Sequence, residues 1–220
     1  QAHPYWVTSV LDLTPGAESV WRVANKRVGR NVRKAERSGV AVERGSTPGH
    51  LHRFRRLFRD KRRRLGVPCY PRRFFDALAA LESPGLEVFL ATVDGRDAAG
   101  VVVLANDALA IYAYGAADDA LAHTRAMDLA MWRAIARSLA LGRARFDFGA
   151  DSPTQESLLR FKAKWGAFQR TLPTAATPDM PPPEAGDFAA PRYARHRAVL
   201  RRCPALLLEA LGHVLTRRDG

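Results

Sequence analysis

Hydrophobic and polar residues alternate over several short stretches of this sequence, and apolar residues recur three and four positions apart over others. Alternation and short apolar runs predict strands, which we expect at residues 5–13, 40–44, 86–93, 98–105, 109–114, 145–148 and 169–173. Helical spacing predicts helices at residues 17–38, 50–65, 72–81, 124–141 and 154–165.

The middle of the chain has the clearest of these patterns. Asp94-Gly95 joins two apolar runs and predicts a tight hairpin, and Asn106-Asp107 leads into a third strand. The sequence therefore predicts an antiparallel meander, preceded by helices and followed by a helix, a strand and a helix. This order is typical of an α+β domain.

The two ends of the chain differ in composition from the rest. The chain opens with Gln1 rather than Met, so we expect a fragment or a processed piece, with residues 1–16 as the end of a preceding domain or a first strand. Residues 17–173 form the main predicted domain. Prolines concentrated in residues 174–191 predict an extended linker. Residues 192–220 predict a basic amphipathic tail helix, which packs on its own domain, on a partner or on a membrane surface.

Positive charge is concentrated in one part of the chain. The 220 residues carry a net charge of +13, and the stretch from Arg22 to Arg73 holds 18 Lys and Arg against 3 Asp and Glu. The remainder has a net charge of −2. One interpretation of this stretch is that it attracts the phosphates of RNA, of a nucleotide-linked substrate or of an anionic membrane. The simpler interpretation is that it is an arginine-rich face in contact with solvent alone.

Several classes of site have no counterpart in the sequence. No apolar run reaches the roughly 18 residues of a membrane span, and the start shows no basic-then-apolar signal peptide. The two cysteines, Cys69 and Cys203, exclude a disulfide scaffold and a four-cysteine metal site, and the six histidines show no metal-binding spacing. Because no nucleophile elbow, phosphate-binding loop or dinucleotide fingerprint is present, any chemistry is expected to rest on positioning and electrostatics.

Three short clusters offer candidate side chains. Strand alternation predicts that Tyr112 and Tyr114 share one sheet face, where two phenols bind a ligand or fill a core. Asp147, between two phenylalanines, is expected on the opposite face of its strand from them, where it caps, pairs with an arginine or meets a ligand. Lys162 lies near a helix end beside a large apolar residue, where an ammonium stabilises an oxyanion or a phosphate, or is simply solvated.

Taken in order, five sequence blocks resemble one known family. The blocks are Arg30–Val40 (RNVRKAERSGV), Arg64–Pro68 (RLGVP), Tyr112–Ala116 (YAYGA), Phe146–Gly149 (FDFG) and Phe161–Gly166 (FKAKWG). Together they resemble the FemAB-like aminoacyl and acyl transferases of the GNAT superfamily. The tail from Val199 to Gly212 resembles the subgroup associated with exosortase/PEP-CTERM systems.

This resemblance implies a GNAT-like fold, in which helices flank a mixed, mostly antiparallel sheet, and this chain resembles the second of two tandem GNAT-like domains. It implies transfer of an acyl or aminoacyl group from acyl-CoA or aminoacyl-tRNA, with no tightly bound cofactor. The implied acceptor is a primary amine on a peptidoglycan or exopolysaccharide precursor, and the implied location is the cytoplasm, at or near the inner membrane. The alternative is a non-catalytic module that binds RNA or anionic membrane through residues 22–73.

The resemblance also implies roles for individual residues. Lys162 matches a lysine that stabilises the tetrahedral intermediate, with Phe161 beside it, and Tyr112 or Tyr114 matches a substrate-binding tyrosine. The other implied contacts are Arg72, Arg73, Asp147 and Trp165 for the substrate, and Thr124, Arg125, Arg30 and Lys34 for an anionic donor.

Two features depart from the pattern of the family. No Q/R-x-x-G-x-G/A loop precedes Thr124, and Ala150-Asp151-Ser152 stands where many relatives have Arg-Ser after the FDFG block. Both changes concern groups expected to contact ligands, so they leave the identity of the donor and of the acceptor open.

Overall fold

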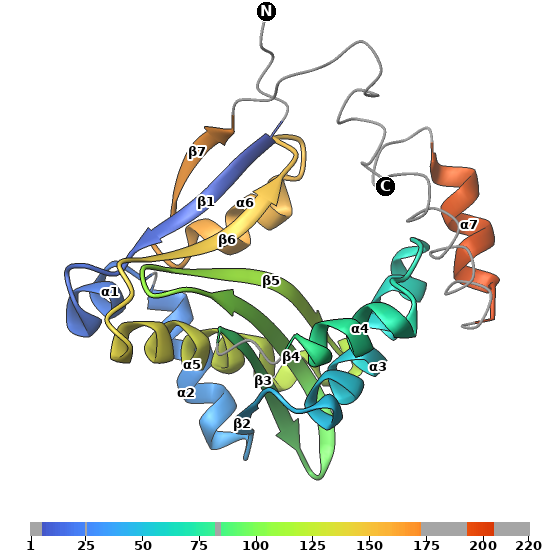
Figure 1. Ribbon diagram of the computed structural model, residues 1–220, viewed down its shortest axis with the longest axis horizontal. Helices are drawn as coiled ribbons and strands as arrows, with labels where there is room; N and C mark the ends of the chain where they lie inside the picture. The colour runs from blue at the N-terminus through green and yellow to red at the C-terminus, as the bar shows by residue number, and fades with distance from the viewer. Residues whose placement is uncertain (1–5, 25, 82–84, 173–192, 205–220) are drawn as a thin grey trace, which may run out of the picture.

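Seven strands form one mixed sheet in the computed structural model, which describes residues 6–24, 26–81, 85–172 and 193–204 (Figure 1). The strands are β1 (Trp6–Asp12), β2 (Ala41–Gly45), β3 (Leu86–Val93), β4 (Arg96–Ala105), β5 (Leu109–Ala117), β6 (Arg145–Asp151) and β7 (Phe168–Leu172). Their order across the sheet is β2-β3-β4-β5-β6-β1-β7. Neighbouring strands are antiparallel except β5 and β6, which run parallel. The predicted meander, β3 to β5, is confirmed.

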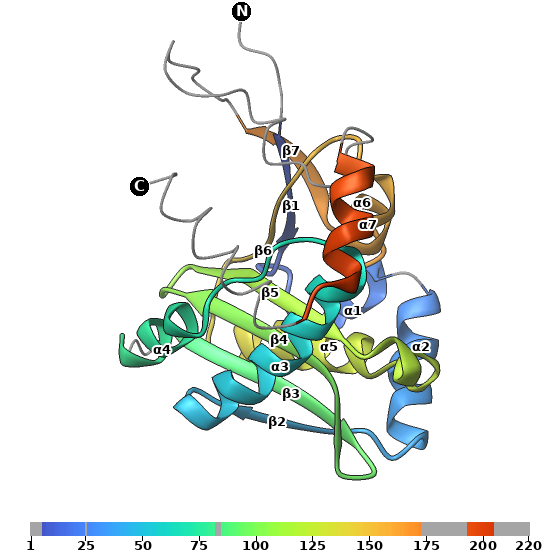
Figure 2. The same cartoon turned by 90° about the vertical axis from the view of Figure 1, so that its right-hand side faces the viewer.

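Helices cover both faces of this sheet. They are α1 (Ala17–Val23), α2 (Lys26–Arg37), α3 (Pro48–Leu65), α4 (Arg72–Ala80), the 3-10 helix η1 (Asp119–Thr124), α5 (Ala126–Ala140), α6 (Glu156–Ala163) and α7 (Ala194–Arg202). The α2 and α5 helices share a core with one face of the sheet, whereas α3 and α4 share a core with the other. In Figure 2, α3 crosses β3 and β4. The predicted α+β class, with helices on a mostly antiparallel sheet, is confirmed.

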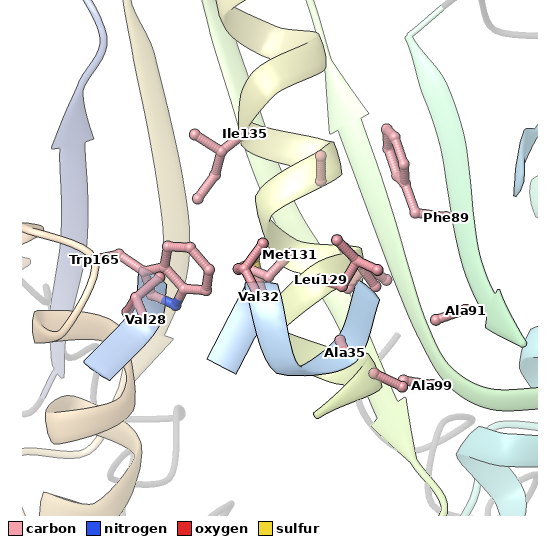
Figure 3. Close-up of a cluster of buried hydrophobic side chains, with 14 of the residues drawn as sticks. Val28, Val32, Ala35, Phe89, Ala91, Ala99, Leu129, Met131, Ile135 and Trp165 are labelled. Carbon is pink, nitrogen blue, oxygen red and sulfur yellow. The ribbon is translucent and has the colours of Figure 1, made fainter. Parts of the chain in front are cut away.

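The buried side chains divide by strand alternation into these two cores. On β4, Val101 and Val103 point toward α2 and α5, and Val102 points toward α3 and α4. Figure 3 shows Val32 of α2 beside Met131 of α5, and Val28 of α2 beside Trp165, in the first core.

The single helix predicted over residues 17–38 is wrong, because the chain forms two helices there. Ala24 has an extended backbone (φ −59°, ψ 135°), which ends α1 before α2 begins. With this break, Trp21 of α1 contacts Trp132 of α5, with ring centroids 4.3 Å apart, while Val28 and Val32 of α2 lie in the core. The apolar residues of this region are too sparse to reveal the break.

Two strands run three residues further than predicted. The β5 strand continues to Ala117 and the β6 strand to Asp151, because Ala116 and Ala117 pair with β4 and Asp151 pairs with Val7 of β1. Glycine residues stand near both predicted ends, but the backbone pairing continues through them. These extensions carry the site described below.

Part of the predicted tail helix is present as α7, which packs against α3. Gly66, at the C-terminal end of α3, has a φ of +69°, and a Cβ added there would overlap the carbonyl oxygen of Arg197. The predicted linker at 174–191 and the apolar stripe of the tail beyond 204 lie outside the described residues. Among the helices that are described, none has the length and apolar character needed to cross a membrane.

Candidate functional site

The candidate site lies where β5 and β6 separate. The two strands pair only between Leu109–Ile111 and Arg145–Asp147. Beyond this point β5 remains paired with β4, and β6 remains paired with β1 (Figure 1). The β1–β6 register shifts here, and Gly149 has a φ of +77°, which glycine adopts without steric cost. The backbone of β6 is therefore bent next to the separation.

Lys162 of α6 reaches this bend. Its side chain is buried, with 3% of its surface exposed. The ammonium donates a hydrogen bond to the carbonyl oxygen of Gly149 (Nζ–O 2.7 Å) and forms an ion pair with the Asp151 carboxylate (Nζ–Oδ2 2.5 Å). A lysine ammonium has three N–H donors. Among the described residues, one of them is donated to Gly149, and the Asp151 carboxylate lies at ion-pair distance without accepting a hydrogen bond of regular geometry at Oδ2.

Asp151 and Tyr112 both have raised pKa values at this site. Burial raises the pKa of Asp151, and the hydrogen bond and charge of Lys162 oppose that rise. Burial also raises the pKa of Tyr112, and the negative charge of Asp151 raises it further. The Tyr112 phenol therefore stays protonated and is able to donate a hydrogen bond. It fills the space over Gly115, where an added Cβ would overlap the phenol oxygen.

The prediction that Tyr112 and Tyr114 share a face is wrong. Tyr112 pairs with Val103 and Tyr114 with the adjacent Val102, so Ala113 is the extra residue of a β-bulge. Tyr112 consequently faces the α5 side and contacts Phe148 (ring centroids 6.4 Å), whereas Tyr114 belongs to the core of α3 and α4.

Tyr114 lies in an aromatic cluster on that other face. Its ring centroid is 5.8 Å from those of Phe58 and Phe74 and 5.7 Å from that of Tyr70. Burial raises the pKa of Tyr114 to about 12. The sheet thus separates Tyr114 from Lys162.

Asp147 lies on the face of β6 opposite Phe146 and Phe148, as the alternation predicts. Its carboxylate accepts hydrogen bonds from the Thr8 hydroxyl and from the backbone N–H of Gly149 (2.7 Å). It lines a pocket of about 260 Å³ together with Thr8, Val10, Leu109, Arg145, Arg170, Thr171 and Leu172. Since Phe148 packs in the core on the α6 side, Asp147 and Lys162 lie on opposite sides of the strand.

The rest of the FKAKWG block packs against the core. Trp165 is 1% exposed, and its ring packs in the core that α2 and α5 share. Phe161 is half-buried, and the Lys164 ammonium lies 4.2 Å from the centroid of its ring. Lys164 also forms an ion pair with Asp128 of α5. The block therefore supplies two Lys–Asp pairs, of which only that of Lys162 lies at the separation of β5 and β6.

Thr124 and Arg125 precede α5. Thr124 is buried, and its hydroxyl donates to the carbonyl oxygen of Leu121 (2.7 Å). Arg125 begins α5 with a left-handed backbone (φ +62°), and its buried Nε has no hydrogen-bond partner among the described residues. Of the two, Arg125 is the residue with an unpartnered donor among the described residues.

The four other predicted basic contacts lie away from Lys162. Arg72 and Arg73 are exposed on α4, on the other face of the sheet, and Arg72 pairs with Asp76 (3.5 Å). Arg30 and Lys34 are exposed on α2. The structure therefore brings together Lys162, Tyr112 and Asp151. Sequence reasoning assigned no role to Asp151, although its place after the FDFG block marks a departure from the family pattern.

The basic stretch does not form one face. Its two main helices, α2 and α3, lie on opposite faces of the sheet. On α3, Arg53 pairs with Asp97, Arg64 pairs with Asp119 (2.8 Å), and Lys61 donates to the carbonyl oxygen of Gly115 (2.9 Å). On α2, by contrast, five exposed cations have no ion pair or hydrogen bond within the described residues: Lys26, Arg30, Arg33, Lys34 and Arg37. Five exposed cations without an acidic partner are therefore gathered on the single helix α2.

No set of three or more His, Cys, Asp or Glu side chains in the described ranges is arranged to hold a metal ion. The arrangement at Lys162 instead offers fixed hydrogen-bond donors, from an ammonium and a phenol, beside a bent strand. Such donors suit a reaction in which an oxygen gains negative charge.

Comparison with known proteins gives a family match and several structural likenesses. A family model described as an acetyltransferase (GNAT) domain matches residues 22–163. The crystal structure of FemX is similar, with a TM-score of 0.67 at 14% identity, over 78% of this chain and 60% of that chain. No curated protein matches the sequence.

Two further structures share the fold. One is the C-terminal domain (DUF2156) of a putative lysylphosphatidylglycerol synthetase from Agrobacterium fabrum, with a TM-score of 0.59 at 14% identity, over 77% of this chain and 59% of that chain. The other is L-PGS from Bacillus licheniformis, with a TM-score of 0.54 at 12% identity, over 74% of this chain and 57% of that chain. This chain thus spans 57–60% of the length of the three solved structures. The family match and these likenesses show that the fold is GNAT-like.

Proposed function

This chain belongs to the acetyltransferase (GNAT) domain family, and we propose that it transfers an acyl or aminoacyl group from a thioester or a tRNA ester to a primary amine. The observation that carries the proposal is the Lys162 ammonium, which is buried, donates a hydrogen bond to Gly149 and is paired with the Asp151 carboxylate. An ammonium fixed in this way stabilises an oxyanion without reorganising during the reaction.

In the proposed reaction, the amine nitrogen attacks the carbonyl carbon of the donor, and the carbonyl oxygen takes up the negative charge. Lys162 donates an N–H to that oxygen, an effect on the order of 3 kcal/mol for one good donor. Collapse of the tetrahedral intermediate breaks the C–S bond of the thioester or the C–O bond of the tRNA ester. The amine gives its proton to water or to a substrate group, and the leaving group takes up a proton.

We propose acyl-CoA or aminoacyl-tRNA as the donor and an amine-bearing cell-envelope precursor as the acceptor. The FemAB-like sequence blocks support this choice, and so do the structural neighbours, one titled FemX and one titled a putative lysylphosphatidylglycerol synthetase. The same resemblance leads us to propose that a preceding GNAT-like domain completes the active unit. Arg125, with its unpartnered Nε at the start of α5, is the residue that we propose for the anionic part of the donor.

The test is a transfer assay on the full-length protein. Labelled acetyl-CoA and labelled aminoacyl-tRNA are each offered with a set of amine acceptors, and the product is measured as label bound to the amine. We expect transfer from one donor class, with uncharged tRNA or free CoA as a competitor of that class alone. Absence of transfer from both donors to every acceptor would contradict the proposal.

A second candidate function is that of a non-catalytic module that binds a polyanion. The five cations on α2 that the fold does not neutralise favour it. Binding of a phosphate polymer releases counterions, so its affinity falls steeply with salt, whereas binding of a small donor in a pocket depends far less on salt. Salt-sensitive binding to every polyanion alike, without transfer, would support this second function.

A further inference from the structure

The ion pair between Lys162 and Asp151 is a feature that the proposed reaction does not yet use. Both side chains are buried, with 3% and 7% of their surface exposed. A buried charge is costly unless an opposite charge lies close to it. One carboxylate oxygen of Asp151 lies 2.5 Å from the Lys162 Nζ and supplies that opposite charge.

Asp151 and Gly149 together also orient the ammonium. Its protons move only by rotation about the Cε–Nζ bond, and the three N–H bonds stand at fixed angles to one another. The hydrogen bond to the Gly149 carbonyl oxygen therefore restrains this rotation, and the Asp151 carboxylate holds the charged group in place as its ion-pair partner. Both groups come from one three-residue segment of β6, which begins at Gly149 with its positive φ.

A purely structural role explains this pair less well. A buried ion pair adds little stability over a well-packed apolar pair of similar size. The segment that carries Lys162 is already anchored in the core by Trp165 and joined to α5 by the ion pair between Lys164 and Asp128. The Lys162 pair instead lies where β5 and β6 separate, with Tyr112 close enough for the charge of Asp151 to act on it.

We infer that Asp151 is a positioning residue of the proposed acyl transfer, which together with the Gly149 carbonyl holds the Lys162 ammonium in place for the developing oxyanion. The inference rests on the proposed function and assigns no contact between Asp151 and a substrate. It predicts that loss of the carboxylate lowers kcat and leaves KM nearly unchanged, because Asp151 acts through Lys162 in the transition state.

The decisive variant is Asp151→Asn in the full-length protein, which keeps the shape of the side chain and removes its charge. We expect kcat to fall about 10-fold to 100-fold, less than the roughly 100-fold to 1,000-fold loss of a direct oxyanion donor. The matched control is Asp97→Asn, which removes a carboxylate that pairs with Arg53 on the other side of the sheet. The control is expected to lower Tm and to leave kcat unchanged.

A double variant separates positioning from structure. If Asp151 acts through Lys162, adding Asp151→Asn to Lys162→Met causes no further loss of kcat, although each single variant is impaired. Losses that multiply in the double variant would overturn the inference, and so would an unchanged kcat in Asp151→Asn. If Asp151→Asn does not fold, Asp151→Glu decides, because it keeps the charge and displaces it: a lowered kcat at the same KM supports the inference, and an unchanged kcat overturns it.

The two proposals fail in different ways. An inactive wild-type protein would overturn the proposed function and the role of Asp151 with it. An active wild type whose Asp151 variants retain full kcat would overturn the role of Asp151 alone.

Discussion

Tyr112 and Tyr114 stand two residues apart on β5 and face opposite sides of the sheet, because Ala113 is the extra residue of a β-bulge. Tyr112 lies over Gly115 on the side of Phe148, in the field of Asp151. Tyr114 lies among aromatic rings on the side of α3 and α4. The two phenols therefore lie in different surroundings, and of the two only the Tyr112 phenol lies at the candidate site.

Removal of the Tyr112 hydroxyl should lower activity. The buried phenol is protonated and able to donate a hydrogen bond to a ligand, so Tyr112→Phe is expected to lower kcat about 10-fold, which corresponds to about 1.4 kcal/mol. Tyr114→Phe keeps the ring contacts with Phe58 and Phe74 and should change kcat less than about twofold. Steady-state transfer kinetics of both variants test this, and equal losses in the two would contradict it.

Lys162→Met should impair both activity and stability. It removes the proposed oxyanion donor, at a cost of about 100-fold to 1,000-fold in kcat. It also leaves Asp151 buried without its partner, which typically costs about 3–5 kcal/mol of stability. The double variant Lys162→Met/Asp151→Asn, which buries no unpaired charge, should regain most of the lost Tm and none of the kcat.

Lys164→Met is the matched control for that experiment. Lys164 lies two residues along the chain and also pairs with an aspartate, but its partner is Asp128 of α5. We expect it to lower Tm and to keep kcat within about threefold of the wild type, because its ammonium lies away from the separation of β5 and β6. A loss of kcat as large as that of Lys162→Met would show that the loss in the latter is structural.

The ionisation of Asp151 should appear in the pH dependence of stability. Burial raises its pKa above the ordinary value of 3.8, against the opposing effect of Lys162. An acid with a raised pKa in the folded state stabilises that state when protonated, so the contribution is fully present below pH 3.8 and is lost as pH rises through the higher value. The free energy of unfolding of the wild type, minus that of Asp151→Asn, should therefore fall over this range and then level off. Urea unfolding of both proteins over a pH series measures the difference, and a flat or rising curve would contradict the prediction.

Features that depend on neighbouring residues alone could be predicted from the sequence. Asp94 and Gly95 both take positive φ values, 49° and 72°, in the two-residue turn that their types favour, so the hairpin is visible locally. The side of β6 that Asp147 occupies follows from alternation with Phe146 and Phe148.

Features that depend on partner strands could not be predicted in this way. The bulge at Ala113 arises from the register between β5 and β4, and nothing in the Tyr-Ala-Tyr order distinguishes a bulged strand from a regular one. The same holds for the bend at Gly149, which brings Asp151 to Lys162. The sequence therefore identifies Lys162 as a candidate and leaves its partner unidentified.

The cations of α2 should decide whether this chain binds a phosphate polymer. Arg30 and Lys34 are exposed and have no ionic partner among the described residues, so the double substitution Arg30→Gln/Lys34→Gln removes two charges that are free to meet phosphates. The matched control, Arg56→Gln/Arg64→Gln, removes two charges from α3 that lie within ion-pair distance of Asp97 (3.6 Å) and Asp119 (2.8 Å). Each phosphate contact contributes about one unit to the slope of log K against log salt. The α2 variant should therefore reduce the slope for tRNA by about two, and the control should reduce it much less.

Equal reductions in the two variants would show that net charge rather than α2 drives binding, because both variants change the net charge by the same amount.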